Sequence, residues 1–141
     1  MFEDIPIQTD SSASSDSLRL LIADDEPTIR QKICELGEKL GFRVSTACSG
    51  SEALEKFKNF NPHLVILDIY MPHGNGLETM IKIKEITPRC PIILITGFLH
   101  YEQLIEQGSV KPDGFIIKPF HIGKVADLML RLVKEKPVVA Q

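Results

Sequence analysis

The sequence predicts an α/β protein built on a doubly wound, five-stranded parallel sheet. Five short apolar runs alternate with stretches whose apolar residues recur at helical spacing. The chain has 141 residues, of which 43% are hydrophobic and 25% charged, a length and composition typical of one globular domain. Polar residues follow most of the apolar runs, at the strand ends where sheets of this class carry their ligand sites.

The first strand and helix are predicted between residues 18 and 41. The apolar run 18–22 forms a buried strand that leads into an acidic pair. Pro27 suits the first position of the following helix. The apolar residues of this helix recur at spacings of four, three and four, so they share one face: Ile29, Ile33, Leu36 and Leu40. Gly41 is typical of a helix end.

The middle of the chain repeats this alternation. Residues 42–47 form the second strand, and the sequence from Ser49 to Glu52 is a capping box that opens the second helix. The dipeptide Asn61-Pro62 ends that helix. The third strand, residues 63–67, is uniformly apolar, which indicates a central position covered on both faces. Residues 77–86 form the third helix.

The last third of the chain supplies two further strands and helices. The fourth strand covers residues 91–95 and the fifth residues 115–117. Between them we expect a short or irregular helix at residues 101–107, because Gly108 and Pro112 bracket its end. The final helix covers residues 122–134.

Residues 1–17 differ from this pattern. They hold four acidic residues, five serines and no lysine or arginine, so we expect a disordered acidic, serine-rich tail. Residues 18–136 then form the folded domain, and residues 137–141 a C-terminal tail. We expect a cytoplasmic location, because no signal peptide or membrane-spanning run is visible. The net charge of −3 argues against direct binding to nucleic acid.

Polar residues at the strand ends are the candidate functional site. The carboxyl ends of parallel strands meet at one edge of the sheet, so these side chains should converge: Asp24, Asp25, Asp68, Thr96 and Lys118. Two carboxylates 4 Å apart repel by about 4 kcal/mol, so a cation between them is expected. Oxygen ligands without histidine or cysteine favour Mg²⁺. Lys118 and Thr96 could bind phosphoryl oxygens, which leaves the central carboxylate of Asp68 to attack phosphorus.

These residues resemble the receiver domain of two-component response regulators. The resemblance covers residues 18–135 and rests on four elements: Asp24-Asp25-Glu26, residues 68–76, Thr96-Gly97 and residues 115–120. It implies a flavodoxin-like sheet of strand order 2-1-3-4-5. It also implies a phosphoacceptor signalling domain, whose own activity is limited to phosphotransfer and autodephosphorylation.

The resemblance assigns a role to each site residue. Asp68 accepts a phosphoryl group from a phosphohistidine on a sensor histidine kinase or a histidine phosphotransfer protein. Asp25, Asp68 and the backbone carbonyl of Tyr70 bind Mg²⁺ directly, and Asp24 acts mainly through water. Thr96 and Lys118 contact the phosphoryl group. Thr96 and the aromatic Phe115 form the switch, and the peptide before Pro119 is cis.

The resemblance also bears on partners. The chain is either a stand-alone receiver or a fragment of a larger regulator, and it acts through a downstream protein effector. The family often signals through its fourth helix, fifth strand and fifth helix. Because Lys111 and Pro112 depart from the small pair usual there, standard dimerisation is in doubt, and we expect a monomer or a weak dimer.

Two other functions fit parts of the pattern. An aspartate-nucleophile phosphatase of the haloacid dehalogenase type needs a second acid two residues after the nucleophile, where this chain has Tyr70. A flavodoxin-like cofactor binder needs a phosphate-binding loop after the first strand, where the acidic pair would repel phosphate. Within the receiver interpretation, Tyr70 and Phe98 lie where polar residues are frequent. Unless both rings merely pack on the surface, they could hinder an attacking water and prolong the phosphorylated state.

Overall fold

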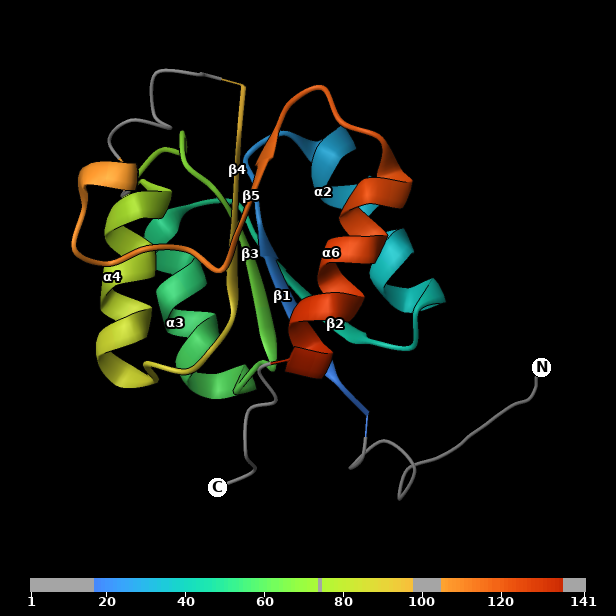
Figure 1. Ribbon diagram of the computed structural model, residues 1–141, viewed down its shortest axis with the longest axis horizontal. Coiled ribbons are helices and arrows are strands. Elements are labelled where there is room, and N and C mark those ends of the chain that lie inside the picture. Colours follow the sequence, from blue (N-terminus) through green and yellow to red (C-terminus); the bar gives the residue numbers. More distant parts are fainter. Residues whose placement is uncertain (1–16, 74, 98–104, 136–141) are drawn as a thin grey trace.

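The computed structural model describes residues 17–73, 75–97 and 105–135 (Figure 1). Five parallel strands form one sheet in the order β2-β1-β3-β4-β5, which confirms the predicted fold class and strand order. Their bounds are β1 Arg19–Ala23, β2 Arg43–Ala47, β3 Leu64–Asp68, β4 Ile92–Thr96 and β5 Gly114–Ile117.

Among the described residues, four helices cover the two faces of this sheet. They are α2 Pro27–Lys39, α3 Gly50–Phe60, α4 Gly76–Ile86 and α6 Ile122–Glu135. Figure 1 shows α3 and α4 packed on one face and α2 and α6 on the other. Residues 105–107 are helical, within the helix predicted at 101–107. Three predicted features lie outside the described residues. They are the start of that helix at residues 101–104, the aromatic residue Phe98, and the two tails, of which only residue 17 is described.

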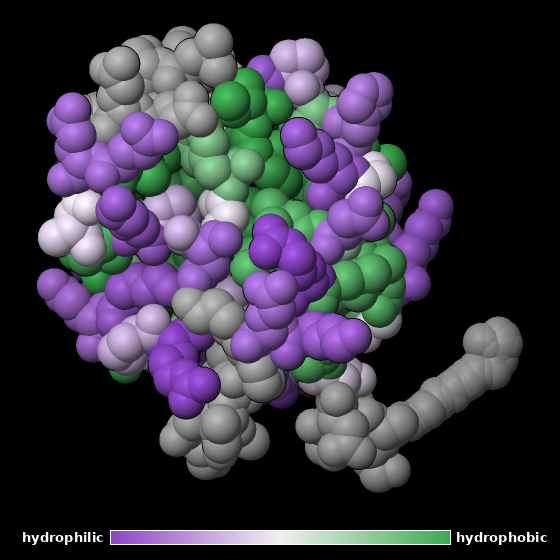
Figure 2. All heavy atoms as spheres, viewed as in Figure 1, coloured by the Kyte–Doolittle hydropathy of each residue, from purple (hydrophilic) through white to green (hydrophobic). Residues whose placement is uncertain are grey.

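The core has two halves, one on each side of the sheet. The half beneath α3 and α4 includes Phe57 and Met80, and the half beneath α2 and α6 includes Ile33 and Met129. All residues of β3 and β4 are buried, as predicted for the third strand. On the face seen in Figure 2, hydrophilic side chains cover much of the helical surfaces, and apolar side chains gather between them. No helix among the described residues is long and apolar enough to cross a membrane.

The strands end at the polar residues that the sequence indicated. Asp68 is the last residue of β3 and Thr96 is the last residue of β4, as predicted. Backbone pairing extends to both residues. Asp68 lies opposite Ile95 in the register, and Thr96 lies opposite Ile117. Both side chains are therefore held by the sheet rather than by a loop.

Helix ends follow the sequence signals closely. Gly41 has a φ of 96°, the left-handed conformation that favours glycine after a helix. The hydroxyl of Ser49 accepts a hydrogen bond from the backbone N–H of Glu52 at 3.1 Å. The second half of the predicted capping box is shifted, because the Glu52 carboxylate accepts from the backbone N–H of Cys48 at 2.9 Å, one residue before the cap.

Candidate functional site

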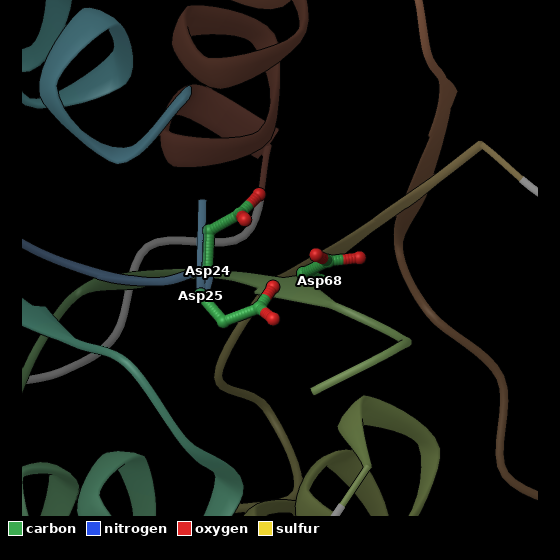
Figure 3. Close-up of side chains that lie close together, drawn as sticks. All are labelled: Asp24, Asp25 and Asp68. Atoms are coloured by element: carbon green, nitrogen blue, oxygen red, sulfur yellow. The ribbon is translucent and has the colours of Figure 1, made fainter. Parts of the chain in front are cut away.

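Three aspartates meet at the carboxyl edge of the sheet. Asp24 and Asp25 follow β1, and Asp68 ends β3, the neighbouring strand. Figure 3 shows their carboxyl groups close together, and one oxygen of each lies within 4.8 Å of the others. We call these residues the aspartate cluster. Asp24 and Asp68 are buried and Asp25 is exposed, so the cluster extends from the protein interior to solvent.

Asp24 is fixed at the base of the cluster by the turn after β1. Its backbone N–H donates to the carbonyl of Ala47 at 3.1 Å, and its Oδ1 accepts from the backbone N–H of Glu26 at 2.8 Å. Its buried Oδ2 makes no hydrogen bond within the described chain, although Lys118 Nζ lies 3.2 Å away as an ion pair. A buried carboxylate oxygen that makes no hydrogen bond within the described residues, and that lies beside two other carboxylates, fits a hard cation that takes oxygen ligands.

Asp68 occupies the centre of the site with only 4% of its surface exposed. Its Oδ1 accepts a weak hydrogen bond from the backbone N–H of Tyr70 at 3.3 Å, and its Oδ2 accepts from Lys118 Nζ at 3.2 Å. Burial, and after it the negative charge of Asp24, raises the pKa of Asp68 to about 7, against the opposing effect of Lys118. The carboxyl group is therefore destabilised in its charged form and is receptive to added positive charge.

Lys118 is the cation of the site. It follows β5, its backbone N–H donates to the carbonyl of Thr96 at 2.7 Å, and the peptide to Pro119 is cis, as the resemblance implied. Its Nζ lies 3.2 Å from Asp24, 3.2 Å from Asp68 and 2.5 Å from Glu26. Burial alone lowers the pKa of Lys118, but the bond to Glu26 and the charges of both aspartates raise it, and the net shift is upward.

Glu26 is a site residue to which sequence reasoning assigned no function. It belongs to the acidic motif Asp24-Asp25-Glu26 after β1, which carries the family resemblance only as a whole. In the structure its carboxylate makes the shortest contact to Lys118, although the two residues are 92 positions apart. No sequence signal could have paired them, because the pairing depends on how the loops after β1 and β5 face one another.

A pocket of about 350 Å³ opens over these groups. Its lining combines the cluster with neighbouring loop residues: Asp25, Glu26, Asp68, Tyr70, Gly97 and Lys118. Tyr70 is 64% exposed, so its ring borders the pocket and is open to solvent. A small anion entering here would pass the exposed Asp25 and Glu26 before it reached the Lys118 ammonium and the buried Asp68 carboxyl group.

The two predicted switch residues, Thr96 and Phe115, lie on the neighbouring strands and are not among the residues that line this pocket. Thr96 is fully buried at the end of β4, and its backbone carbonyl accepts from Lys118. Phe115 lies on β5 opposite Leu94, is half-buried, and packs against the core half beneath α3 and α4. The structure therefore places Thr96 behind the site and Phe115 further along the neighbouring strand.

Gly76 holds the backbone of Asp68 in place. It opens α4, and its N–H donates to the carbonyl of Ile69 at 2.8 Å. A Cβ at this position would lie 2.4 Å from the Asp68 carbonyl oxygen and 2.9 Å from Ile69 Cα. Only glycine permits this approach, so α4 begins directly against the strand end that carries the central carboxylate.

Comparisons with known proteins agree with this geometry. The model of the "Response regulator receiver domain" family matches residues 20–130. The chemotaxis protein CheY of Thermotoga maritima is 32% identical over 117 residues, which cover 82% of this chain and 98% of that protein. CheY of Bacillus subtilis is 34% identical and covers 77% of this chain and 92% of its own length.

Solved structures and longer regulators give the same picture. The response regulator TrrA of Thermotoga maritima, solved in complex with Mg(2+)-BeF, aligns with a TM-score of 0.75 at 36% identity, over 82% of this chain and 98% of that one. The Escherichia coli regulatory protein AtoC is 28% identical over 82% of this chain, but only 25% of AtoC is covered. These similarities leave the phosphatase and cofactor-binding alternatives without support. The site geometry and the family match together place this chain in the response regulator receiver domain family, the phosphoacceptor signalling domains of two-component systems.

Proposed function

We propose that Asp68 of this receiver domain is the phosphoacceptor, and that Asp24, Asp25 and Lys118 make its phosphorylation possible. The observation that carries this proposal is the position of the Asp68 carboxyl group. It is almost fully buried, yet it lines a pocket in which Lys118 Nζ lies 3.2 Å from its Oδ2. A carboxylate so placed can reach an incoming phosphorus atom only from the pocket side, where the Lys118 ammonium also lies.

The proposed reaction is phosphoryl transfer from a phosphohistidine. One Asp68 carboxylate oxygen forms a bond to phosphorus, and the bond between phosphorus and the imidazole nitrogen breaks. The electron pair of that bond stays on the imidazole nitrogen of the donor. The Nζ of Lys118 stabilises the negative charge that develops on a phosphoryl oxygen, as phosphoryl transfer requires. Because the pKa of Asp68 is raised to about 7, added positive charge in the pocket should increase the fraction of Asp68 that carries the nucleophilic carboxylate.

Mg²⁺ is the proposed cofactor. The residues that would hold it are Asp24, Asp25, Asp68 and the backbone carbonyl of Tyr70. The close approach of the three carboxylates and the buried Asp24 Oδ2, which makes no hydrogen bond within the described residues, support this assignment. When bound, Mg²⁺ supplies charge that offsets the repulsion among the carboxylates and the phosphoryl oxygens.

Thr96 and Phe115 are the proposed switch. Thr96 ends β4, and its backbone carbonyl accepts a hydrogen bond from the Lys118 backbone N–H. A movement of Lys118 toward the phosphoryl group can therefore be passed to Thr96 through this hydrogen bond. Phe115 is half-buried on the adjacent strand, where it has room to change its exposure. The outcome would be altered contact with a protein effector. A solved complex of CheX with CheY from Borrelia burgdorferi, whose CheY chain is 30% identical to this one, supports a protein partner of that kind.

The phosphoryl donor is proposed to be a sensor histidine kinase or a histidine phosphotransfer protein, and autodephosphorylation by water is proposed to reset the domain. Because the exposed Tyr70 ring borders the pocket, we expect it to slow that water together with Phe98. The double variant Tyr70→Asn with Phe98→Glu should lose its phosphoryl group about tenfold faster, a change of about 1.4 kcal/mol in the barrier. An unchanged decay rate would show that the rings do not shield the site.

Intact-mass spectrometry after incubation with acetyl phosphate tests the central proposal. We expect one phosphoryl adduct on the wild-type chain that requires Mg²⁺. The adduct should be lost in Asp68→Asn and retained in Asp127→Asn, a matched change at an exposed aspartate on α6. An adduct that persists in Asp68→Asn would refute the assignment.

A further inference from the structure

Glu26 and Lys118 form a contact that the receiver chemistry does not require. The Glu26 carboxylate lies 2.5 Å from Lys118 Nζ, closer than either aspartate at 3.2 Å. The ammonium side chain is 16% exposed and the Glu26 side chain 56% exposed. Glu26 therefore approaches Lys118 from the solvent side of the pocket, whereas Asp24 and Asp68 approach it from the interior.

We propose that Glu26 is a positioning residue that competes with the incoming phosphoryl group for Lys118 and so sets how readily Asp68 is phosphorylated. This inference rests on the proposed function of Asp68 and Lys118. Glu26 lines the same pocket as both residues, so a phosphoryl group on Asp68 must share Lys118 with the Glu26 carboxylate. Lysine has only three N–H donors on its ammonium, and here it already faces three carboxylates.

Charge strengthens the competition. A phosphoryl group carries nearly two negative charges, and Glu26 adds a third at the open side of the same pocket. The charges of Asp24 and Asp25 would be offset by the proposed Mg²⁺, and Asp68 is the proposed acceptor. The ion pair described for Glu26 is the one with Lys118. Glu26 therefore favours the resting site over the phosphorylated site.

The size of the effect follows from the exposure of Glu26. Ion pairs at this degree of exposure change an equilibrium by about two- to fivefold, because solvent screens them. Replacing Glu26 by glutamine removes the charge and keeps the shape. We therefore expect Glu26→Gln to bind beryllofluoride, a stand-in for the phosphoryl group, about two- to fivefold more tightly. The rate of phosphorylation by acetyl phosphate should rise by a similar factor.

The test is a beryllofluoride titration at saturating Mg²⁺, followed by NMR of the ¹⁵N-labelled chain, together with acetyl phosphate kinetics. Glu38→Gln, a matched change at an exposed position near the other end of α2, is the control and should behave as wild type. Tighter binding and faster phosphorylation in Glu26→Gln alone would support the proposal, and a merely structural role would not strengthen ligand binding.

Two results would overturn it. If Glu26→Gln and Glu38→Gln have the same beryllofluoride affinity and the same rate of phosphorylation, Glu26 does not compete for Lys118. Weaker binding in Glu26→Gln would show that Glu26 instead assists the bound cation. If the wild-type chain itself takes up neither beryllofluoride nor a phosphoryl group, the proposed function fails rather than this inference.

Discussion

Asp68→Asn should make the metal-free protein more stable at alkaline pH, even though it removes the phosphoacceptor. The pKa of Asp68 is raised from 3.8 to about 7 by burial and by Asp24. A group whose pKa is raised by folding contributes its full stability below the unfolded value. That contribution is lost as the pH rises through the folded value, here between 3.8 and about 7. An amide has no such titration and repels Asp24 less.

The magnitude follows from the same shift. A pKa raised from 3.8 to about 7 corresponds to about 4 kcal/mol at alkaline pH. Solvent in the open pocket screens part of this cost, and the amide loses part of the attraction to Lys118, so a net gain of about 1–2 kcal/mol is expected. The gain should be near zero at about pH 4 and largest near pH 8.

Urea denaturation in EDTA at a series of pH values measures this difference. Asp127→Asn, at an exposed position, is the control and should show little change in the free energy of unfolding at any pH. Saturating Mg²⁺ should reduce or reverse the advantage of Asp68→Asn, because ligand binding stabilises only the chain that holds it well. An Asp68→Asn variant that is less stable than wild type at pH 8 in EDTA would refute the reasoning.

Three further predictions concern the scaffold around the site. Gly76→Ala should lower the free energy of unfolding by about 1–3 kcal/mol and slow phosphorylation, because its Cβ would meet the Asp68 carbonyl oxygen at 2.4 Å. Gly123→Ala on α6, where a Cβ meets nothing within 4 Å, is the control for urea denaturation and should be neutral or stabilising. Burial, and then the charge of Arg19, lowers the pKa of His63, whose Nδ1 accepts from the Arg19 backbone N–H at 3.0 Å. His63 should therefore contribute to the free energy of unfolding above its unfolded pKa of about 6.5, and this contribution should be lost as the pH falls through the lower pKa of the folded state. In urea denaturation at a series of pH values, His63→Asn should show a weaker pH dependence than wild type. Lys84→Met should cost about 2–3 kcal/mol, because Lys84 Nζ lies 2.7 Å from Asp113 Oδ2 with both side chains nearly buried. If adding Asp113→Asn restores none of that loss, the two charges are not coupled.

Local signals were sufficient for most elements of this fold. Proline at the start of α2, serine at the cap of α3 and glycine after α2 each act through the backbone within a few residues, so they are legible in sequence. The uniformly apolar third strand correctly indicated the centre of the sheet, because only a strand covered on both faces buries every residue. The partners of Asp68 along the edge also followed, since parallel strands bring their carboxyl ends together.

The tertiary structure decided what depends on distance and burial. Asp68 is only 4% exposed and Thr96 is fully buried, and the polarity of these residues does not reveal that burial. Glu26 became a partner of Lys118 only when the loops after β1 and β5 came face to face. The upward shift in the pKa of Asp68 likewise arises from burial and from the charge of nearby Asp24, and folding creates both the burial and the proximity. The sequence by itself indicated which polar groups end the strands at this edge, because residue type and the apolar runs before them are local properties of the chain. Their spacing, burial and competition for one ammonium group were set by packing between segments about fifty to ninety residues apart.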